Sequence, residues 1–185
     1  AEGEAQSRDE LLAHHAGVAG DPWDGRPSRE AHFLQLLASR YPALERRDLT
    51  PVLDSLRYVK SAREIALIRQ ASLLAGLGLL EAMKSTRAGV FEYQVAAVAR
   101  FTFLANGARF EGYNPIAGGG TNAWMGHYSR NLDALKDGDM VLMDYAPDLR
   151  YYTSDVARMW PVSGTYTDAQ RTLANFILEY RAAFF

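Results

Sequence analysis

Cysteine is absent from this 185-residue chain. Its absence excludes disulfides, thiolate zinc sites, iron–sulfur clusters and cysteine nucleophiles. An excess of one charge is absent too, because 20 basic residues stand against 22 acidic ones and the formal net charge is −2. No general attraction to nucleic acid or to anionic membranes follows from that balance. Hydrophobic residues make up 48% of the chain, which is typical of a folded globular protein and excludes a disordered or fibrous one.

Long hydrophobic runs are also missing. The most apolar stretch, residues 73–80, is far shorter than the roughly 20 residues that span a bilayer, so we predict no transmembrane segment and no membrane partner. The basic residues are dispersed, so we expect no nucleic-acid partner. The polar N-terminus is unlike a signal peptide and lacks an initiator methionine, which predicts a processed chain or a piece of a longer protein. We expect a cytoplasmic location, although a chain without cysteine fits the periplasm as well.

Helical signals are weak in residues 1–60 and clear afterwards. Only one short helix is predicted in the first part, from the spacing of Phe33, Leu36 and Leu37. Ser61 and Glu64 form a capping-box pattern that begins a helix running to about residue 84. Its second half is apolar on most sides, which predicts that it is well buried. Gly76 and Gly78 each cost about 1 kcal/mol inside a helix, so we expect a neighbouring element to pack closely there. A second helix is predicted over 91–105.

Strand patterns follow the second predicted helix. We predict strands over 110–116, 140–145 and 151–162, with a flexible turn at the three glycines of 118–120. No Gly-Lys-Ser/Thr follows those glycines, which argues against a phosphate-binding loop. Thr167 and Gln170 form a second capping box. The helix after them carries an apolar face that requires a partner, made by Leu173, Phe176, Ile177, Tyr180 and Phe184.

Two aspartates on neighbouring predicted strands are the candidate chemistry. If the hairpin turns tightly at residues 149–150, Asp144 lies directly opposite Asp155. Two like charges that close are destabilising unless one carboxyl is protonated or a cation lies between them. A divalent metal with oxygen ligands is the natural compensating ion. The alternative is structural, with Asp155 paired to Arg158 or capping, and Asp144 beginning a turn.

His127 is the third residue of interest. It lies 17 positions before Asp144, after the glycine turn. A histidine here could orient a substrate or stabilise a developing negative charge, and the alternative is a structural role. His14, His15 and His32 lie in the weakly patterned N-terminal part and are interpreted as surface residues.

The linked motifs from about residue 56 to residue 180 resemble the pita-bread metallopeptidases: aminopeptidase P, prolidase, methionine aminopeptidase and creatinase. The run 56–69 resembles the entry to the catalytic domain in the proline-specific branch. His127-Tyr128 followed by 138–144 resembles the segment with the family's first substrate histidine and first metal aspartate. The run 154–158, followed by Pro-Val-Ser-Gly at 161–164, resembles the strand with the second metal aspartate.

The resemblance implies an α+β fold, a partial pita-bread domain with helices on a curved, mainly antiparallel sheet. In that family two divalent metal ions, often manganese, cobalt or zinc, are held by two aspartates, one histidine and two glutamates. It implies that Asp144 and Asp155 are metal ligands and that His127 contacts the substrate or the tetrahedral intermediate. No histidine follows His127 in this chain, and the sequence ends 30 residues after Asp155, so three of the five ligands are not present. The sequence also carries Ala157 and Ala146 where many relatives have threonine and glycine.

We therefore interpret the chain as a fragment of an Xaa-Pro aminopeptidase or Xaa-Pro dipeptidase. Residues 1–55 would be the tail of an N-terminal domain or a linker, and 56–185 the first half of the catalytic domain. The expected partners are a peptide with proline at its second position, the remainder of the same protein, and further copies in a homo-oligomer. Alone, the chain is expected to be inactive and to bind metal weakly. The alternatives are a metal-free creatinase-like hydrolase and an inactive peptidase-like module that binds proteins; both retained aspartates argue against them.

Overall fold

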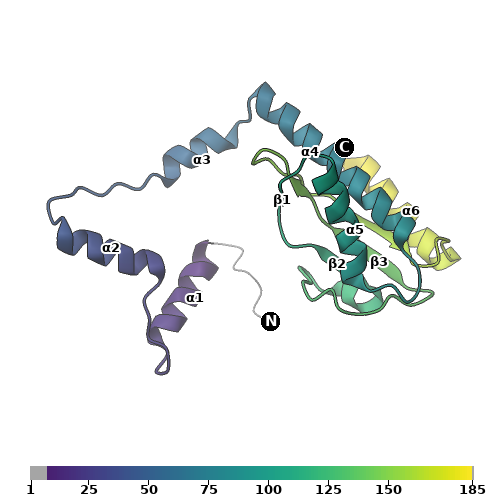
Figure 1. Cartoon of the computed structure of the whole chain (residues 1–185), viewed down its shortest axis with the longest axis horizontal. Coiled ribbons are helices and arrows are strands. Elements are labelled where there is room, and N and C mark those ends of the chain that lie inside the picture. Colours follow the sequence, from purple (N-terminus) through teal and green to yellow (C-terminus); the bar gives the residue numbers. More distant parts are fainter. Residues whose placement is uncertain (1–7, 185) are drawn as a thin grey trace. The chain divides into compact units, whose positions relative to one another are not determined.

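The chain divides into two units, Ala1–Tyr58 and Val59–Phe185, in a computed structural model that describes residues 8–184 (Figure 1). The first unit holds three helices: α1 (Arg8–Gly20), α2 (Arg29–Arg40) and α3 (Thr50–Tyr58). Helix α2 confirms the short predicted helix, and it begins where the Ser28 hydroxyl accepts a hydrogen bond from the Ala31 N–H at 3.1 Å. None of the residues of α2 or α3 is buried.

Two long helices form one layer of the second unit. Helix α4 (Ala62–Ser85) begins at the predicted capping box, since the Ser61 N–H donates to Glu64 at 2.6 Å and the Glu64 N–H donates to the Ser61 hydroxyl at 3.3 Å. Helix α5 (Glu92–Ala105) follows after Gly89 and packs along α4 (Figure 1). Both predicted helices are confirmed.

Helix α4 buries one face only, through residues such as Ala71, Leu74 and Leu79. The prediction that its second half is well buried holds for that face alone, because Leu73 is 70% exposed on the opposite face. The prediction of a close neighbour is right for Gly78, where an added Cβ would lie 2.2 Å from the Phe103 ring of α5. At Gly76 no atom lies within 4 Å of that position.

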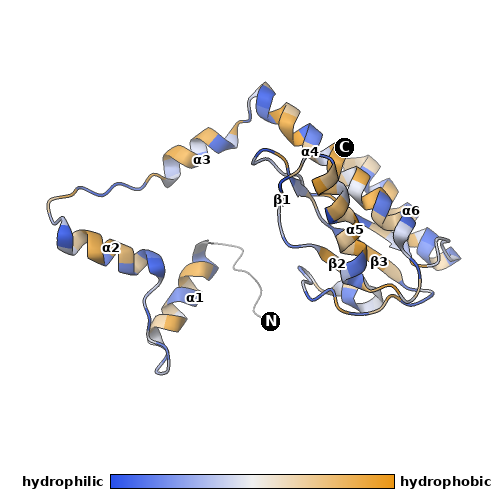
Figure 2. Ribbon diagram, in the orientation of Figure 1, coloured by the Kyte–Doolittle hydropathy of each residue, from blue (hydrophilic) through white to orange (hydrophobic). Residues whose placement is uncertain are grey.

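By length and composition alone, α4 could cross a membrane, contrary to the sequence prediction. Core helices pass the same test, and the buried face of α4 lies in the hydrophobic core of the second unit. Figure 2 shows hydrophobic and hydrophilic residues side by side along α4 and α6.

The second layer is a three-stranded antiparallel sheet in the order β2 (Ile116–Gly119), β3 (Met140–Asp144), β5 (Ala157–Pro161). A two-stranded pair joins β1 (Phe110–Glu111) to β4 (Pro147–Asp148). Strand β3 buries Val141 and Met143 in the core, while Leu142 and Asp144 alternate with them on the other face. The predicted α+β class, helices on a mainly antiparallel sheet, is confirmed.

Two strand predictions and the predicted glycine turn need correction. The predicted strand 110–116 is two short strands, because β1 pairs with β4 and β2 pairs with β3. The predicted glycine turn is wrong: Gly118 and Gly119 lie in β2, and Gly120 begins the 3-10 helix η1 (Gly120–Trp124). The predicted strand 151–162 is regular only in β5, since the residues before it form a turn and an irregular segment.

Helix α6 (Asp168–Phe184) confirms the last predicted helix. Its capping box is present, with the Thr167 N–H donating to Gln170 at 2.9 Å and the Gln170 N–H donating to the Thr167 hydroxyl at 3.3 Å. The predicted apolar face is exposed, and no described residue of α6 is buried.

Candidate active site

Asp144 ends β3 on the face of the sheet opposite α4 and α5, and its side chain is half-buried. The Tyr113 hydroxyl donates a hydrogen bond to Asp144 Oδ1 at 2.5 Å. Tyr113 lies between β1 and β2, so the bond joins two segments that are distant in the sequence. Tyr113 therefore fixes the orientation of one of the two predicted metal ligands.

The predicted pairing of Asp144 with Asp155 is wrong in register. Asp144 pairs with Ala157, and Leu142 pairs with Met159. The turn explains the difference, because Arg150 and Tyr151 both have positive φ angles, 56° and 68°, and form the two-residue loop. The prediction placed this loop one residue earlier, and moving a tight turn by one residue moves every cross-strand partner by two.

Asp155 lies before β5 and is exposed, yet it is near the same tyrosine. The pKa of Tyr113 is raised, first by burial, then by its hydrogen bond to Asp144, and further by the charges of Asp144 and Asp155. The segment before β5 packs closely on the residues before Tyr113, since a Cβ on Gly112 would lie 2.1 Å from the Thr153 hydroxyl oxygen. Asp144 thus binds the Tyr113 hydroxyl directly, and Asp155 acts on it through its charge although the two aspartates are not cross-strand partners.

One structural alternative for Asp155, the ion pair with Arg158, is wrong. In the described part of the chain no ion pair joins Asp155 to Arg158, whose guanidinium donates instead to the carbonyl of Ala157 at 2.7 Å. Within residues 8–184 no group of three or more histidine, aspartate or glutamate side chains is placed to hold a metal ion. The carboxylates of Asp144 and Asp155 form no ion pair among the residues that the structure describes, so their oxygen atoms are available as two ligands of a metal site. Their metal role remains a prediction.

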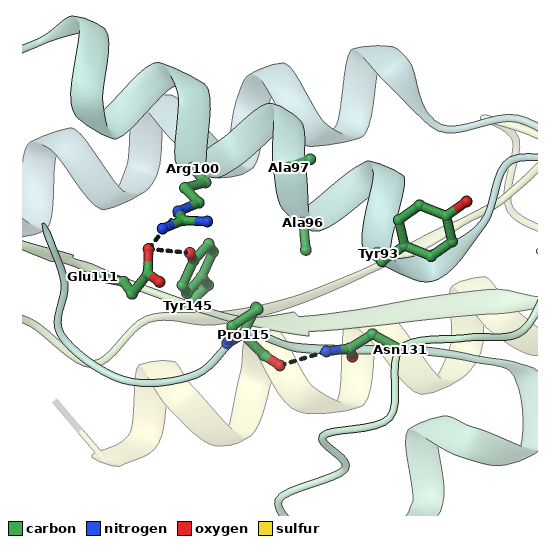
Figure 3. Close-up of a pocket in the computed structure, with 8 residues that line it drawn as sticks. All are labelled: Tyr93, Ala96, Ala97, Arg100, Glu111, Pro115, Asn131 and Tyr145. Carbon is green, nitrogen blue, oxygen red and sulfur yellow. Dashed lines mark hydrogen bonds and ion pairs between the residues drawn. The ribbon is translucent and has the colours of Figure 1, made fainter.

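On the helix side of the sheet, Tyr145 follows Asp144 and is buried beside a cavity of about 160 Å³ (Figure 3). The Tyr145 hydroxyl donates to Glu111 at 3.1 Å, and Glu111 forms an ion pair with Arg100 of α5 at 2.7 Å. Burial and the Glu111 charge raise the pKa of Tyr145. The Tyr145 ring also packs against Phe103, with centroids 5.0 Å apart. These contacts tie the end of β3 to α5.

His127 lies in the loop between η1 and β3, with an exposed side chain and a φ angle of 52°. Its neighbour Tyr128 is buried and donates a hydrogen bond to Glu92 of α5 at 2.7 Å. Burial and this bond raise the pKa of Tyr128 to about 12. The substrate role of His127 remains a prediction. His14 and His32 are exposed and His15 is half-buried.

Sequence reasoning missed Tyr113 and Glu92. Neither belongs to a local motif that suggests chemistry, since the partners of Tyr113 lie 31 or more positions away and those of Glu92 lie 27 or more away. The one available signal was a carboxylate at the start of a buried helix, Glu92, which could have been expected to bind backbone N–H groups.

Comparison with known proteins gives concordant results. The profile of metallopeptidase family M24 matches residues 66–185. The Xaa-Pro aminopeptidase of Haemophilus influenzae is 38% identical over 132 residues, 71% of this chain and 31% of that protein. The Escherichia coli Xaa-Pro aminopeptidase is 37% identical over 71% of this chain and 30% of its own length. The structure of zinc-substituted E. coli aminopeptidase P in complex with product matches 86% of this chain and 37% of its own, with 32% identity and a TM-score of 0.70. The chain thus spans about a third of the length of these relatives.

Proposed function

The chain belongs to metallopeptidase family M24 and has the pita-bread fold of aminopeptidase P over part of that domain, and on this premise we propose that it supplies part of the active site of an Xaa-Pro aminopeptidase. Such an enzyme hydrolyses the peptide bond before a proline at the second position. The observation that carries the proposal is the placement of Asp144, bound by the Tyr113 hydroxyl, opposite Ala157, two residues after Asp155. An Xaa-Pro dipeptidase uses the same chemistry and differs in the length of peptide it accepts.

The two aspartates fit a divalent metal site. Both side chains offer anionic oxygen atoms, and no ion pair with a basic side chain neutralises either one among residues 8–184. Hard divalent cations prefer such ligands. When bound, manganese, cobalt or zinc would polarise the scissile carbonyl and lower the pKa of water at the site.

The chain's own residues would then share the remaining work. Asp144 and Asp155 hold the cations, and Tyr113 orients Asp144 through its hydrogen bond. His127 contacts the substrate and stabilises negative charge that develops on the carbonyl oxygen. We further propose that residues 56–185 are the first half of the catalytic domain, and that the other metal ligands come from elsewhere in the full-length protein.

The test is cleavage of an Xaa-Pro peptide by the full-length protein, with and without added manganese, cobalt or zinc. We expect cleavage that needs both a metal ion and proline, and its loss in Asp144→Ala and in Asp155→Ala with reduced metal content. Asp137→Ala is the matched control, because Asp137 is an exposed carboxylate in the segment leading into β3. Full activity after removal of metal by a chelator, or in both aspartate variants, would refute the proposal. The 185-residue chain alone should not cleave the peptide.

A further inference from the structure

A buried carboxylate outside the candidate metal site organises the loop that carries His127. Glu92 is the first residue of α5 and is 1% exposed. Its Oε1 accepts from the Gly119 N–H at 2.8 Å and from the Asn122 amide at 2.9 Å. Its Oε2 accepts from the Tyr128 hydroxyl at 2.7 Å and from the Asp133 N–H at 3.1 Å. We call these five residues the Glu92 network.

The network closes the loop of residues 119–133 at both of its ends. Gly119 ends β2 and Asn122 lies in η1, so they hold the start of the loop. Tyr128 and Asp133 hold the second half of the loop, and the Glu92 N–H also donates to the Asp133 carbonyl at 3.0 Å. The carboxylate lies at the positive end of the α5 dipole, which favours a negative charge there.

His127 lies inside this closed loop in a conformation that needs support. A φ angle of 52° is in the left-handed region, which residues other than glycine rarely adopt. Such backbone conformations persist where the surroundings determine them, and they concentrate at functional sites. The residue that follows, Tyr128, is 6% exposed and bound to Glu92, so the network fixes the chain directly beside His127.

We propose that Glu92 is a positioning residue. Through its contacts with Tyr128 and Asp133, it holds His127 at the place where His127 meets the substrate. This inference rests on the proposed function for the role of His127. The placement of the loop does not depend on that function and can be tested separately.

Glu92→Gln is the sharpest perturbation because both carboxylate oxygens accept from a backbone N–H. Whichever way the amide of the variant is oriented, its NH₂ group faces the N–H of Gly119 or of Asp133, and neither backbone group can reverse its role. Asn122→Ala is a milder variant, because it removes the Asn122 amide contacts to Glu92, Tyr128 and Asp133 but leaves the carboxylate and its two backbone donors in place. Val95→Ala is the control, since Val95 is a fully buried residue of α5 outside the network.

The first measurement is hydrogen exchange in the full-length protein. In Glu92→Gln, and to a smaller extent in Asn122→Ala, exchange in residues 119–133 should be about tenfold faster or more, because network hydrogen bonds are lost. Exchange in β3 and β5 should change no more than it does in Val95→Ala. Unchanged exchange in residues 119–133 in both network variants would overturn the proposal, whether or not the protein cleaves peptides. If Glu92→Gln does not fold, the Asn122→Ala result decides.

The second measurement is a kinetic cycle with His127→Ala on an Xaa-Pro peptide. We expect Glu92→Gln to lower kcat by about 10²-fold at unchanged metal content, as misplacement of a substrate-contacting group does. In the His127→Ala background the same substitution should have little further effect, whereas Val95→Ala should act equally in both backgrounds. If the losses of kcat in Glu92→Gln and His127→Ala multiplied in the double variant, the two residues would act independently and the proposal would be overturned. Failure of the wild-type protein to cleave Xaa-Pro peptides would refute the proposed function and leave the exchange measurement as the test of the network.

Discussion

The two glycines of α4 give a prediction in which the same substitution has opposite signs two residues apart. In a helix interior, Gly→Ala normally raises the free energy of unfolding by about 1 kcal/mol. Around Gly76 no atom lies within 4 Å of an added Cβ. Gly76→Ala should therefore raise the free energy of unfolding by that full amount, about 1 kcal/mol.

At Gly78 the added methyl group would lie 2.2, 2.9 and 3.0 Å from three carbon atoms of the Phe103 ring. Carbon atoms in contact are normally about 3.5 Å apart, so the ring would have to move by about 1.3 Å. Phe103 is 1% exposed and packs on Tyr145, which leaves it little room. Overpacking of this kind costs about 1–3 kcal/mol. The net effect of Gly78→Ala is a loss of about 0–2 kcal/mol, or about 1–3 kcal/mol relative to Gly76→Ala.

The assay is thermal and urea unfolding of both variants, followed by circular dichroism at 222 nm. For a domain of this size the difference should separate the two melting temperatures by about 4 °C for each kcal/mol. Phe103→Leu should lower the free energy of unfolding less in the Gly78→Ala variant than in the wild-type protein, because the smaller side chain relieves the clash with the added methyl group. Equal stabilisation by both alanine substitutions would refute the close packing of α4 on α5.

Two further predictions concern Tyr113 and Glu64. Tyr113→Phe should weaken divalent-metal binding by the full-length protein about 10–100-fold, because Asp144 loses the donor that orients it; calorimetric titration with manganese checks this, and an unchanged affinity would contradict it. The pKa of Glu64 is lowered from 4.5 to about 2, chiefly by the Ser61 N–H and hydroxyl and also by the Tyr152 hydroxyl. A lowered folded-state pKa stabilises above the unfolded value, so this contribution should be complete above about pH 4.5 and lost as the pH falls toward 2. As the pH is lowered across that window, the urea midpoint of Glu64→Gln should fall less steeply than that of the wild-type protein. Parallel pH profiles of the two proteins would contradict the lowered pKa of Glu64.

Helix positions could be predicted because their signals are local. The bonds between Ser61 and Glu64, and between Thr167 and Gln170, connect residues three apart, and the sequence displays both partners together. The family motifs around Asp144 and Asp155 are equally short. What could be predicted was therefore α2, α4, α5 and α6, the fold class and the two candidate ligands, whereas α1 and α3, in the weakly patterned first unit, were missed.

The pairing of the strands could not be predicted in the same way. The hairpin turn has Arg150 and Tyr151 at positive φ. Glycine or asparagine at these positions would have predicted the turn from the sequence. Gly118 and Gly119 looked like a turn but serve as strand residues. Tyr113 was missed because its importance comes from a partner 31 positions away, and nothing in its own neighbourhood records that contact.

The same separation in sequence bears on when the site assembles. The Ser61–Glu64 bonds close a loop of a few residues, whereas the Tyr113–Asp144 bond closes one of 31 and the Glu92–Asp133 bond one of 41. Long loops lose more entropy on closure, and contacts distant in sequence form later in folding. During synthesis, α4 and α5 can pair before the ribosome has translated β3. The candidate site is complete only once Asp155 has been added, so a chain stalled just before β3 would contain the two helices and neither aspartate.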